Sequence, residues 1–251
     1  LRVLIFQQKL KLAFSLFSTI NEFYQTTHGR LHDFTKTNAY RDIQEKQIFA
    51  SSNFFNADSK VARSMETQIL ATLVRYFNPQ TIFEIGTYNG FSTTHFAYNS
   101  SPDTKIYTLD LPRDYDLIAA QQEKLKKYSY YDLLVVQLSK ENIDKRLYQG
   151  HPCGKKVTEL FGDSLNFDFS PYCGKMDFIF IDGCHALPYV RSDTTNAFKM
   201  LSARGMIVWH DFDYIIHRDV FKYLNRLVKT HKIYSIPNTR FALYSPVLCG
   251  E

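Results

Sequence analysis

Thr81-Ile82-Phe83-Glu84-Ile85-Gly86-Thr87-Tyr88-Asn89-Gly90 is the stretch that most constrains the fold of this chain. Its first half, 81–85, is a β-branched and aromatic run typical of a buried parallel strand. The two glycines then form a turn, and residues 91–98 can form a helix. A strand, a glycine turn and a helix N-terminus direct backbone N–H groups at a ligand. Glu84 lies inside the strand, where an unpaired charge is costly, so the stretch predicts a nucleotide-like ligand beside the end of a first strand.

The glycine spacing separates two kinds of cofactor site. Dinucleotide enzymes use G-x-G-x-x-G, which lets a pyrophosphate lie on the helix N-terminus. This chain has E-x-G-x-x-x-G, with three residues between its glycines and no third glycine. On this pattern alone, an ordinary tight turn in another α/β protein stays an alternative.

The rest of the chain alternates strand-like and helix-like segments, which indicates a mostly parallel sheet with helices on both faces. Residues 64–77 have apolar side chains at helical spacing, and Asn78-Pro79 ends that helix. We expect an α/β, Rossmann-like three-layer sandwich with a seven-stranded sheet and an antiparallel last strand from the hairpin around Pro237-Asn238. The predicted strands after the first are 105–112, 157–161, 176–183, 205–209, 232–236 and 240–244.

Two regions do not follow this alternation. Residues 1–63 are predicted to be a helical N-terminal extension that caps the site or mediates dimerisation, and residues 64–251 form the main domain. Residues 113–156 are too long for a normal crossover and indicate an inserted substrate-binding or subunit-contact element, with a helix over 116–128.

Composition narrows the function classes. The 251 residues are 45% hydrophobic and 22% charged, which is ordinary for a globular protein. The net charge is +5, but the basic residues are scattered rather than gathered on one face, so we expect no nucleic-acid partner. The four cysteines have no C-x-x-C or zinc-like spacing, which favours a reduced, cytoplasmic setting. The apolar segment 1–20 favours a contact within the domain or a homodimer over a membrane surface.

Acidic side chains occur near the end of every predicted core strand. In an open α/β sheet, ligands bind beyond the carboxyl ends of the strands. A single Asp there also serves as a turn former or helix N-cap, but a set at equivalent places forms a constellation. Its members are Glu84, Asp110, Asp163, Asp182 and Asp211.

Taken in order, these motifs resemble those of class I S-adenosylmethionine-dependent methyltransferases. The segments 162–172 and 181–185 resemble more narrowly the methyltransferase-24 branch, which includes cephalosporin-hydroxylase-like and macrolide O-methyltransferases. The likeness covers residues ~65–245. It implies S-adenosylmethionine as the cofactor and O-methylation of a small hydroxylated molecule or sugar.

The resemblance also implies roles for individual residues. The methionine part of the cofactor would lie against Glu84, Gly86, Tyr88 and Gly90, and the ribose hydroxyls would bind Asp110. Asp163 and Ser164 would lie at the adenine end. The cofactor-binding set is completed by neighbours in the same motifs: Thr87, Ser92, Leu111, Gly162 and Asp182.

Catalysis requires that an acceptor hydroxyl loses its proton as it attacks the methyl group. In metal-dependent relatives, carboxylates at the positions of Asp182 and Asp211 hold Mg²⁺, which prefers oxygen ligands and lowers the pKa of a bound hydroxyl. This chain departs from the family pattern by placing His210 before Asp211. Alternatively, His185 or His210 acts as general base with a near-neutral pKa.

Two other functions stay open at this point. An NAD-dependent oxidoreductase is disfavoured by the missing G-x-G-x-x-G motif. A non-catalytic cofactor-binding assembly module is disfavoured by the acidic residues at all five strand ends.

Overall fold

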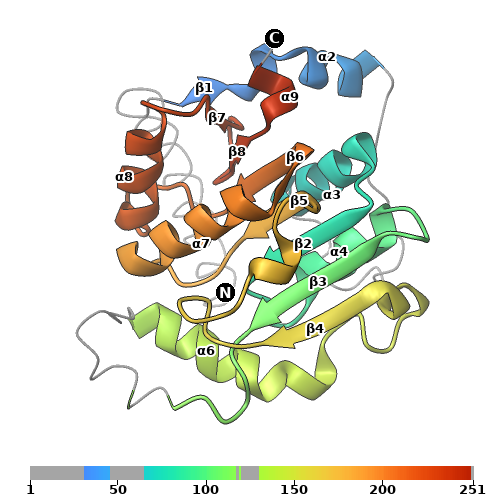
Figure 1. Cartoon of the computed structure of the whole chain (residues 1–251), viewed down its shortest axis with the longest axis vertical. Coiled ribbons are helices and arrows are strands. Elements are labelled where there is room, and N and C mark those ends of the chain that lie inside the picture. The colour runs from blue at the N-terminus through green and yellow to red at the C-terminus, as the bar shows by residue number, and fades with distance from the viewer. Residues whose placement is uncertain (1–30, 46–64, 117–118, 120–129, 250–251) are drawn as a thin grey trace, which may run out of the picture.

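The computed structural model describes residues 31–45, 65–116, 119 and 130–249. These residues form a three-layer α/β sandwich in which helices cover both faces of a central sheet (Figure 1). The sheet has the order β1-β7-β8-β6-β5-β2-β3-β4. Its strands are β1 (His32–Asp33), β2 (Thr81–Ile85), β3 (Lys105–Asp110), β4 (Val157–Phe161), β5 (Met176–Ile181), β6 (Leu201–Trp209), β7 (Tyr234–Ser235) and β8 (Ala242–Tyr244).

The pairing confirms the predicted sheet, with one strand more than expected. Strands β2 to β6 pair in parallel, and β8 pairs antiparallel with both β6 and β7. The predicted count of seven is wrong because β1 pairs in parallel with β7 at the sheet edge, within the segment predicted to be helical. The fifth predicted strand also begins earlier, at Leu201, directly after the helix before it.

The helices follow the predicted alternation, and α6 and α9 are additional to the predicted ones. The predicted helix 116–128 falls almost wholly outside the described residues. α6 follows it within the predicted insertion. The described helices are α2 (Asn38–Glu45), α3 (Met65–Phe77), α4 (Phe91–Asn99), α6 (Tyr130–Asn142), α7 (Leu187–Met200), α8 (Arg218–Leu227) and α9 (Pro246–Cys249), with 3₁₀ turns η1 (Phe34–Lys36), η2 (Ile143–Lys145), η3 (Pro152–Lys156) and η4 (Ser170–Tyr172).

Two apolar cores fix the layers. Ile82 of β2 packs in the core beneath α3 and α4, whereas its neighbour Phe83 packs in the core beneath α7 and α8. Both side chains are fully buried. Because the central strands are covered on both faces, they are continuous apolar runs rather than alternating ones. The even residues of β2 therefore point toward α4, and Glu84 is one of them.

The N-terminal extension is described only at residues 31–45, which form β1, η1 and α2. The apolar segment 1–20, for which a domain or dimer contact is predicted, lies outside the described residues. Within the described part of the chain, no helix combines the length and apolar character that a membrane crossing requires.

Candidate active site

The turn 86–90, here called the Gly loop, joins β2 to α4. Gly86 has a φ of +98° and Gly90 a φ of +75°, which L side chains rarely adopt. A Cβ on Gly86 would lie 2.1 Å from the carbonyl oxygen of Asp182, and one on Gly90 would lie 2.6 Å from the ring of Tyr148. Only glycine therefore lets this loop pack between the end of β5 and the insertion.

Glu84 lies beneath the Gly loop and is fully buried. Its carboxylate accepts hydrogen bonds from the hydroxyls of Ser92, Thr93 and Thr108. Burial raises the pKa of Glu84 to about 7, although these hydroxyls oppose the shift. The side chain thus ties β2 to α4 and β3, and it supports the loop from below instead of lining a cavity.

Asp110, at the end of β3, also has several donors. Its Oδ2 accepts from the Tyr88 N–H at 3.0 Å, the Ser139 hydroxyl at 2.6 Å and Arg146 Nη2 at 2.9 Å. Its Oδ1 accepts from the Leu111 N–H at 2.8 Å. Burial raises the pKa of Asp110, and the four donors oppose that shift. The carboxylate is therefore oriented by partners from three separate parts of the chain.

Asp163 is a turn former. Its Oδ1 accepts from the Leu165 N–H at 3.1 Å, which caps the turn after β4. Its Oδ2 accepts from the hydroxyls of Tyr115 at 2.9 Å and Tyr189 at 3.2 Å. Ser164, the next residue, lines the cavity described below.

A cavity of about 510 Å³ lies along the carboxyl ends of the strands. The insertion contributes part of its wall through α6, including Asp132, Leu134 and Leu138. Three predicted cofactor residues, Glu84, Gly90 and Asp163, do not line it. The predicted residues that do are Gly86, Thr87, Tyr88, Ser92, Asp110, Leu111, Gly162, Ser164, Asp182, His185, His210 and Asp211.

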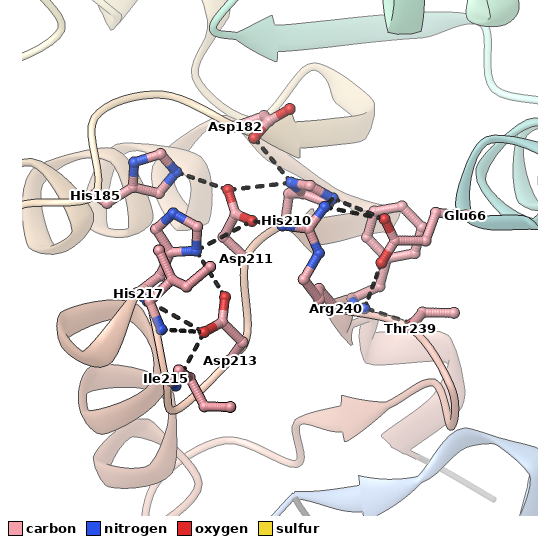
Figure 2. Close-up of polar contacts among 12 residues, drawn as sticks. Glu66, Asp182, His185, His210, Asp211, Asp213, Ile215, His217, Thr239 and Arg240 are labelled. Carbon is pink, nitrogen blue, oxygen red and sulfur yellow. Dashed lines mark hydrogen bonds and ion pairs between the residues drawn. The ribbon is translucent and has the colours of Figure 1, made fainter. Parts of the chain in front are cut away.

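Charged side chains gather at one end of this cavity and are drawn in Figure 2, with the exception of Asp132. We call this group the acid–imidazole cluster. It joins α3, α6, the ends of β5 and β6, and the turn before β8. Its members are Glu66, Asp132, Asp182, His185, His210, Asp211 and Arg240.

His185 lies between two carboxylates. Its Nδ1 is 2.6 Å from Asp132 Oδ1, and its Nε2 is 2.7 Å from Asp211 Oδ2. Burial on its own lowers the pKa of an imidazole, but the two carboxylates outweigh burial and raise the pKa of His185 to about 10. The predicted near-neutral pKa is therefore wrong for this residue, which is an imidazolium at neutral pH.

His210 also lies among carboxylates, which contact both of its ring nitrogens. Its Nδ1 lies 3.1 Å from Asp182 Oδ1 and 3.2 Å from Asp211 Oδ2, and its Nε2 lies 3.3 Å from Glu66 Oε2. Burial again lowers its pKa, and the surrounding carboxylates raise it well above the usual value. The near-neutral prediction fails here too, because carboxylates from three elements converge on one imidazole.

Asp211 is the centre of the cluster. Its Oδ1 lies 2.6 Å from Arg240 Nη1 and 3.2 Å from His217 Nδ1. Its Oδ2 faces Nε2 of His185 and Nδ1 of His210. Burial raises its pKa, but His210 and His185 hold the pKa of Asp211 well below its usual range. Arg240 and His185 each bond one oxygen of Asp211, while the Nδ1 atoms of His217 and His210 also bond Asp213 and Asp182.

A magnesium ion does not fit this arrangement. The polar atoms of Asp182, His210 and Asp211 lie within 4.8 Å of one another, as ligands of one ion would. However, Arg240 and His185 already bond the two oxygens of Asp211, and Arg240 places a fixed positive charge 2.6 Å from its Oδ1. His210 supplies nitrogen where magnesium prefers oxygen. The carboxylates of the cluster are instead paired with three cations of the chain, His185, His210 and Arg240.

Sequence reasoning missed several residues of this site. Glu66 accepts from the Arg240 backbone N–H at 2.6 Å and from its Nη2 at 3.3 Å. Burial opposes ionisation, but His210 and Arg240 lower the pKa of Glu66 to about 2. Glu66 and Asp132 lie on helices away from the strand ends, and Arg240 lies in a hairpin, so no strand-end pattern marks them.

Comparison with known proteins places this site in a family. A family model described as a methyltransferase domain, methyltransferase-24, matches residues 83–212, which is more than half of the chain. The chain belongs to this methyltransferase family. The matched range runs from β2 to the residue after Asp211, so it contains the Gly loop and most of the acid–imidazole cluster.

Individual relatives of this methyltransferase domain are distant. A probable caffeoyl-CoA O-methyltransferase 3 from Dictyostelium discoideum is 23% identical over 180 residues, which are 70% of this chain and 62% of that protein. Catechol O-methyltransferase B from Danio rerio is 40% identical over 53 residues, 21% of this chain and 20% of that protein. The chain thus spans less than two thirds of either curated relative.

A solved structure confirms the methyltransferase fold. The O-methyltransferase TomG from Streptomyces achromogenes, crystallised with SAM, superposes with a TM-score of 0.51 at 15% identity. The match covers 92% of this chain and 97% of that one.

Gly86→Ala is expected to lower the free energy of unfolding by about 3 kcal/mol or more, because a methyl group meets the Asp182 carbonyl at a positive φ. Gly174→Ala is the matched control. Gly174 has a φ of +68° but nothing within 4 Å of the added Cβ, so strain alone costs about 1 kcal/mol. Urea unfolding measures both variants, and equal losses would contradict the close approach.

The stability of the domain is expected to fall at alkaline pH through His185. Its pKa rises from 6.5 to about 10 on folding, so this stabilisation is complete below pH 6.5 and is lost as pH rises through about 10. His185→Gln should reduce the pH 7 to 10 loss by roughly 2–4 kcal/mol. Urea midpoints across this range test it, with His231→Gln outside the cluster as control. An unchanged pH dependence in His185→Gln would refute the imidazolium assignment.

Proposed function

We propose that this chain transfers a methyl group from S-adenosylmethionine to a hydroxyl of a small molecule. The observation that carries the proposal is one continuous cavity that joins the Gly loop, Asp110 and Ser164 to the acid–imidazole cluster. The part lined by the Gly loop, Asp110 and Ser164 has the features of a site for a nucleoside and an amino acid. The part lined by the acid–imidazole cluster has the charged groups that proton transfer requires.

The first part of the cavity suits the cofactor. The Gly loop leaves no side chain where its backbone meets β5, so a ligand can approach backbone N–H groups at the start of α4. Within the described ranges, Asp110 Oδ1 has a single donor, the Leu111 N–H, and so retains the capacity to accept from a ribose hydroxyl. Leu134, Val135 and Leu138 of α6 offer an apolar wall for a base.

S-adenosylmethionine, when bound, supplies an electrophilic methyl group on a sulfonium. The residues of the chain must then orient the acceptor oxygen in line with that methyl group and remove its proton. The electron pair of the broken carbon–sulfur bond stays on sulfur, and the acceptor proton passes to the protein.

We assign the proton acceptor to Asp182. Among the described residues, its carboxylate bonds to His210 through Oδ1, and its side chain is 33% exposed at the cavity. Asp182 Oδ2 is thus available to an acceptor hydroxyl. His185 and His210 carry protons on both ring nitrogens at neutral pH, so with Arg240 they stabilise negative charge that develops on the acceptor oxygen.

The acceptor end of the cavity is mixed in character. Thr67, Leu70 and Phe241 line it beside Glu66 and Arg240. These side chains suit a small hydroxylated molecule with an apolar face, such as an aromatic alcohol or a sugar. Oxygen as the accepting atom is supported by two relatives named for O-methylation of caffeoyl-CoA and catechol.

The setting of the reaction is also part of this proposal. Cys153, Cys173 and Cys184 are free thiols, which supports a reducing, cytoplasmic compartment. A homodimer formed through residues 1–63 stays a prediction, as does the lack of a nucleic-acid partner.

Calorimetry with S-adenosylhomocysteine is expected to give a dissociation constant in the micromolar range, about −8 kcal/mol, whereas NAD gives no heat. Asp110→Asn should weaken that binding at least tenfold, because a hydrogen bond to a charged group is replaced. NAD binding would support the oxidoreductase alternative. Binding without turnover of any hydroxylated acceptor would support the assembly module. No binding of S-adenosylhomocysteine to folded protein would overturn the proposal.

Asp182→Asn is expected to lower kcat about 100-fold or more, the usual contribution of a positioned base, with a smaller effect on cofactor affinity. Methyl transfer from labelled cofactor to an acceptor found by screening measures this change in kcat.

Because magnesium does not fit the cluster, turnover should be unchanged by a chelator. Loss of activity in chelator and its recovery with Mg²⁺ would refute the metal-independent assignment.

A further inference from the structure

Arg146 is a fully buried cation in the insertion, with none of its side chain exposed. It follows η2 and lies outside the cavity lining. A buried guanidinium must be paired, because an unpaired charge away from water is costly. Its partners therefore indicate what it holds in place.

The partners of Arg146 belong to the predicted cofactor site. Its Nη2 donates to Asp110 Oδ2 at 2.9 Å, and its Nε donates to the Tyr88 carbonyl at 3.3 Å. Its Nη1 lies 3.4 Å from Glu159 Oε2 on β4. The guanidinium thus bridges the Gly loop, the end of β3 and the middle of β4.

Tyr88 is held from both sides by this arrangement. Its φ of +50° is uncommon for a residue with a side chain. Its N–H donates to Asp110 Oδ2 at 3.0 Å, while its carbonyl accepts from Arg146. The next residue along the insertion, Leu147, donates its N–H to the Asn89 carbonyl at 3.0 Å. The insertion is therefore bonded to the Gly loop at two consecutive positions.

The hydrogen-bond donors to Asp110 are divided unequally between its two carboxylate oxygens. Arg146, Ser139 and Tyr88 all donate to Oδ2, whereas Leu111 is the one donor to Oδ1 among the residues that the structure describes. The Asp110 side chain is 12% exposed and lines the cavity. Anchoring Oδ2 leaves the accepting capacity of Oδ1 for a ligand.

Resting on the function proposed above, we propose that Arg146 is a positioning residue for ribose recognition, which it controls through Asp110 without contact with the cofactor. The bidentate reach of a guanidinium is required, because one group must bond the carboxylate and the loop carbonyl together. A lysine carries its three N–H donors on one nitrogen, so it does not reproduce the two separately placed nitrogens, Nη2 and Nε, that bond Asp110 and Tyr88.

The test compares S-adenosylhomocysteine with its analogue that lacks both ribose hydroxyls, by calorimetry on the full chain. The wild-type protein should bind the parent ligand at least tenfold more tightly. In Arg146→Met that ratio should fall to about twofold or less, since Asp110 Oδ2 loses its guanidinium donor and the Tyr88 carbonyl loses its anchor. Glu159→Gln is the matched control, because it alters the same network away from Asp110, and it should keep the wild-type ratio.

Arg146→Lys guards against misfolding of the methionine variant, because it keeps the buried charge. It should lose at least half of the discrimination between the two ligands while its circular dichroism and melting temperature stay near wild type. If Arg146→Met or Arg146→Lys weakens both ligands equally and keeps the ratio, Arg146 is only a structural residue and the proposal is wrong. A wild-type protein that binds neither ligand would instead refute the proposed function.

Discussion

Parallel strands that end in register at one edge of the sheet are the constraint on which this site depends. Ile85 is level with Leu109 of β3 on one side and with Ile181 of β5 on the other, and Ile181 is level with Trp209 of β6. The residues that follow each strand therefore emerge side by side. Hydrogen bonds continue the register past the strands, with Gly86 N–H donating to Leu109 and Asp182 N–H donating to Ile85, both at 2.9 Å.

Close backbone contact at this edge is possible because Gly86 has no side chain. The space between its Cα and the Asp182 carbonyl would be filled by a Cβ. Side chains at the strand ends are consequently drawn together into one cavity. The carboxylates that result lie too near one another to stay ionised unless cations accompany them.

Charge balance then decides the chemistry of the acid–imidazole cluster. The centre is Asp211, whose carboxylate is surrounded by Arg240 and three imidazoles. Raised imidazole pKa values and lowered carboxylate pKa values are two results of the same electrostatic attraction. In this buried network the protons stay on His185 and His210, because the neighbouring carboxylates stabilise the imidazolium form. This network is the basis on which we propose charge stabilisation for the histidines and proton acceptance for Asp182.

Local patterns in the sequence were sufficient to predict the fold and much of the cavity. Strands such as β2 and β5 are apolar runs whose ends carry glycine and aspartate, and these signals depend only on neighbours along the chain. The roles of Glu84 and Asp163 could not be read in this way. Glu84 is enclosed by hydroxyls of α4 and β3, and Asp163 is used by its own turn and by two tyrosines, so neither lines the cavity.

By itself, the sequence determined the core strands β2 to β6, the Gly loop and the carboxylates at the strand ends, because backbone propensity and apolar periodicity are local properties. Only the tertiary structure decided which cations those carboxylates meet. Arg146 lies 36 positions from Asp110, and Arg240 lies 174 positions from Glu66. Such pairs form through packing between elements distant in the chain, and no local spacing encodes them. The protonation of His185 follows in the same way from its contacts with Asp132 and Asp211. The misfit of magnesium follows from the contact of Arg240 with Asp211.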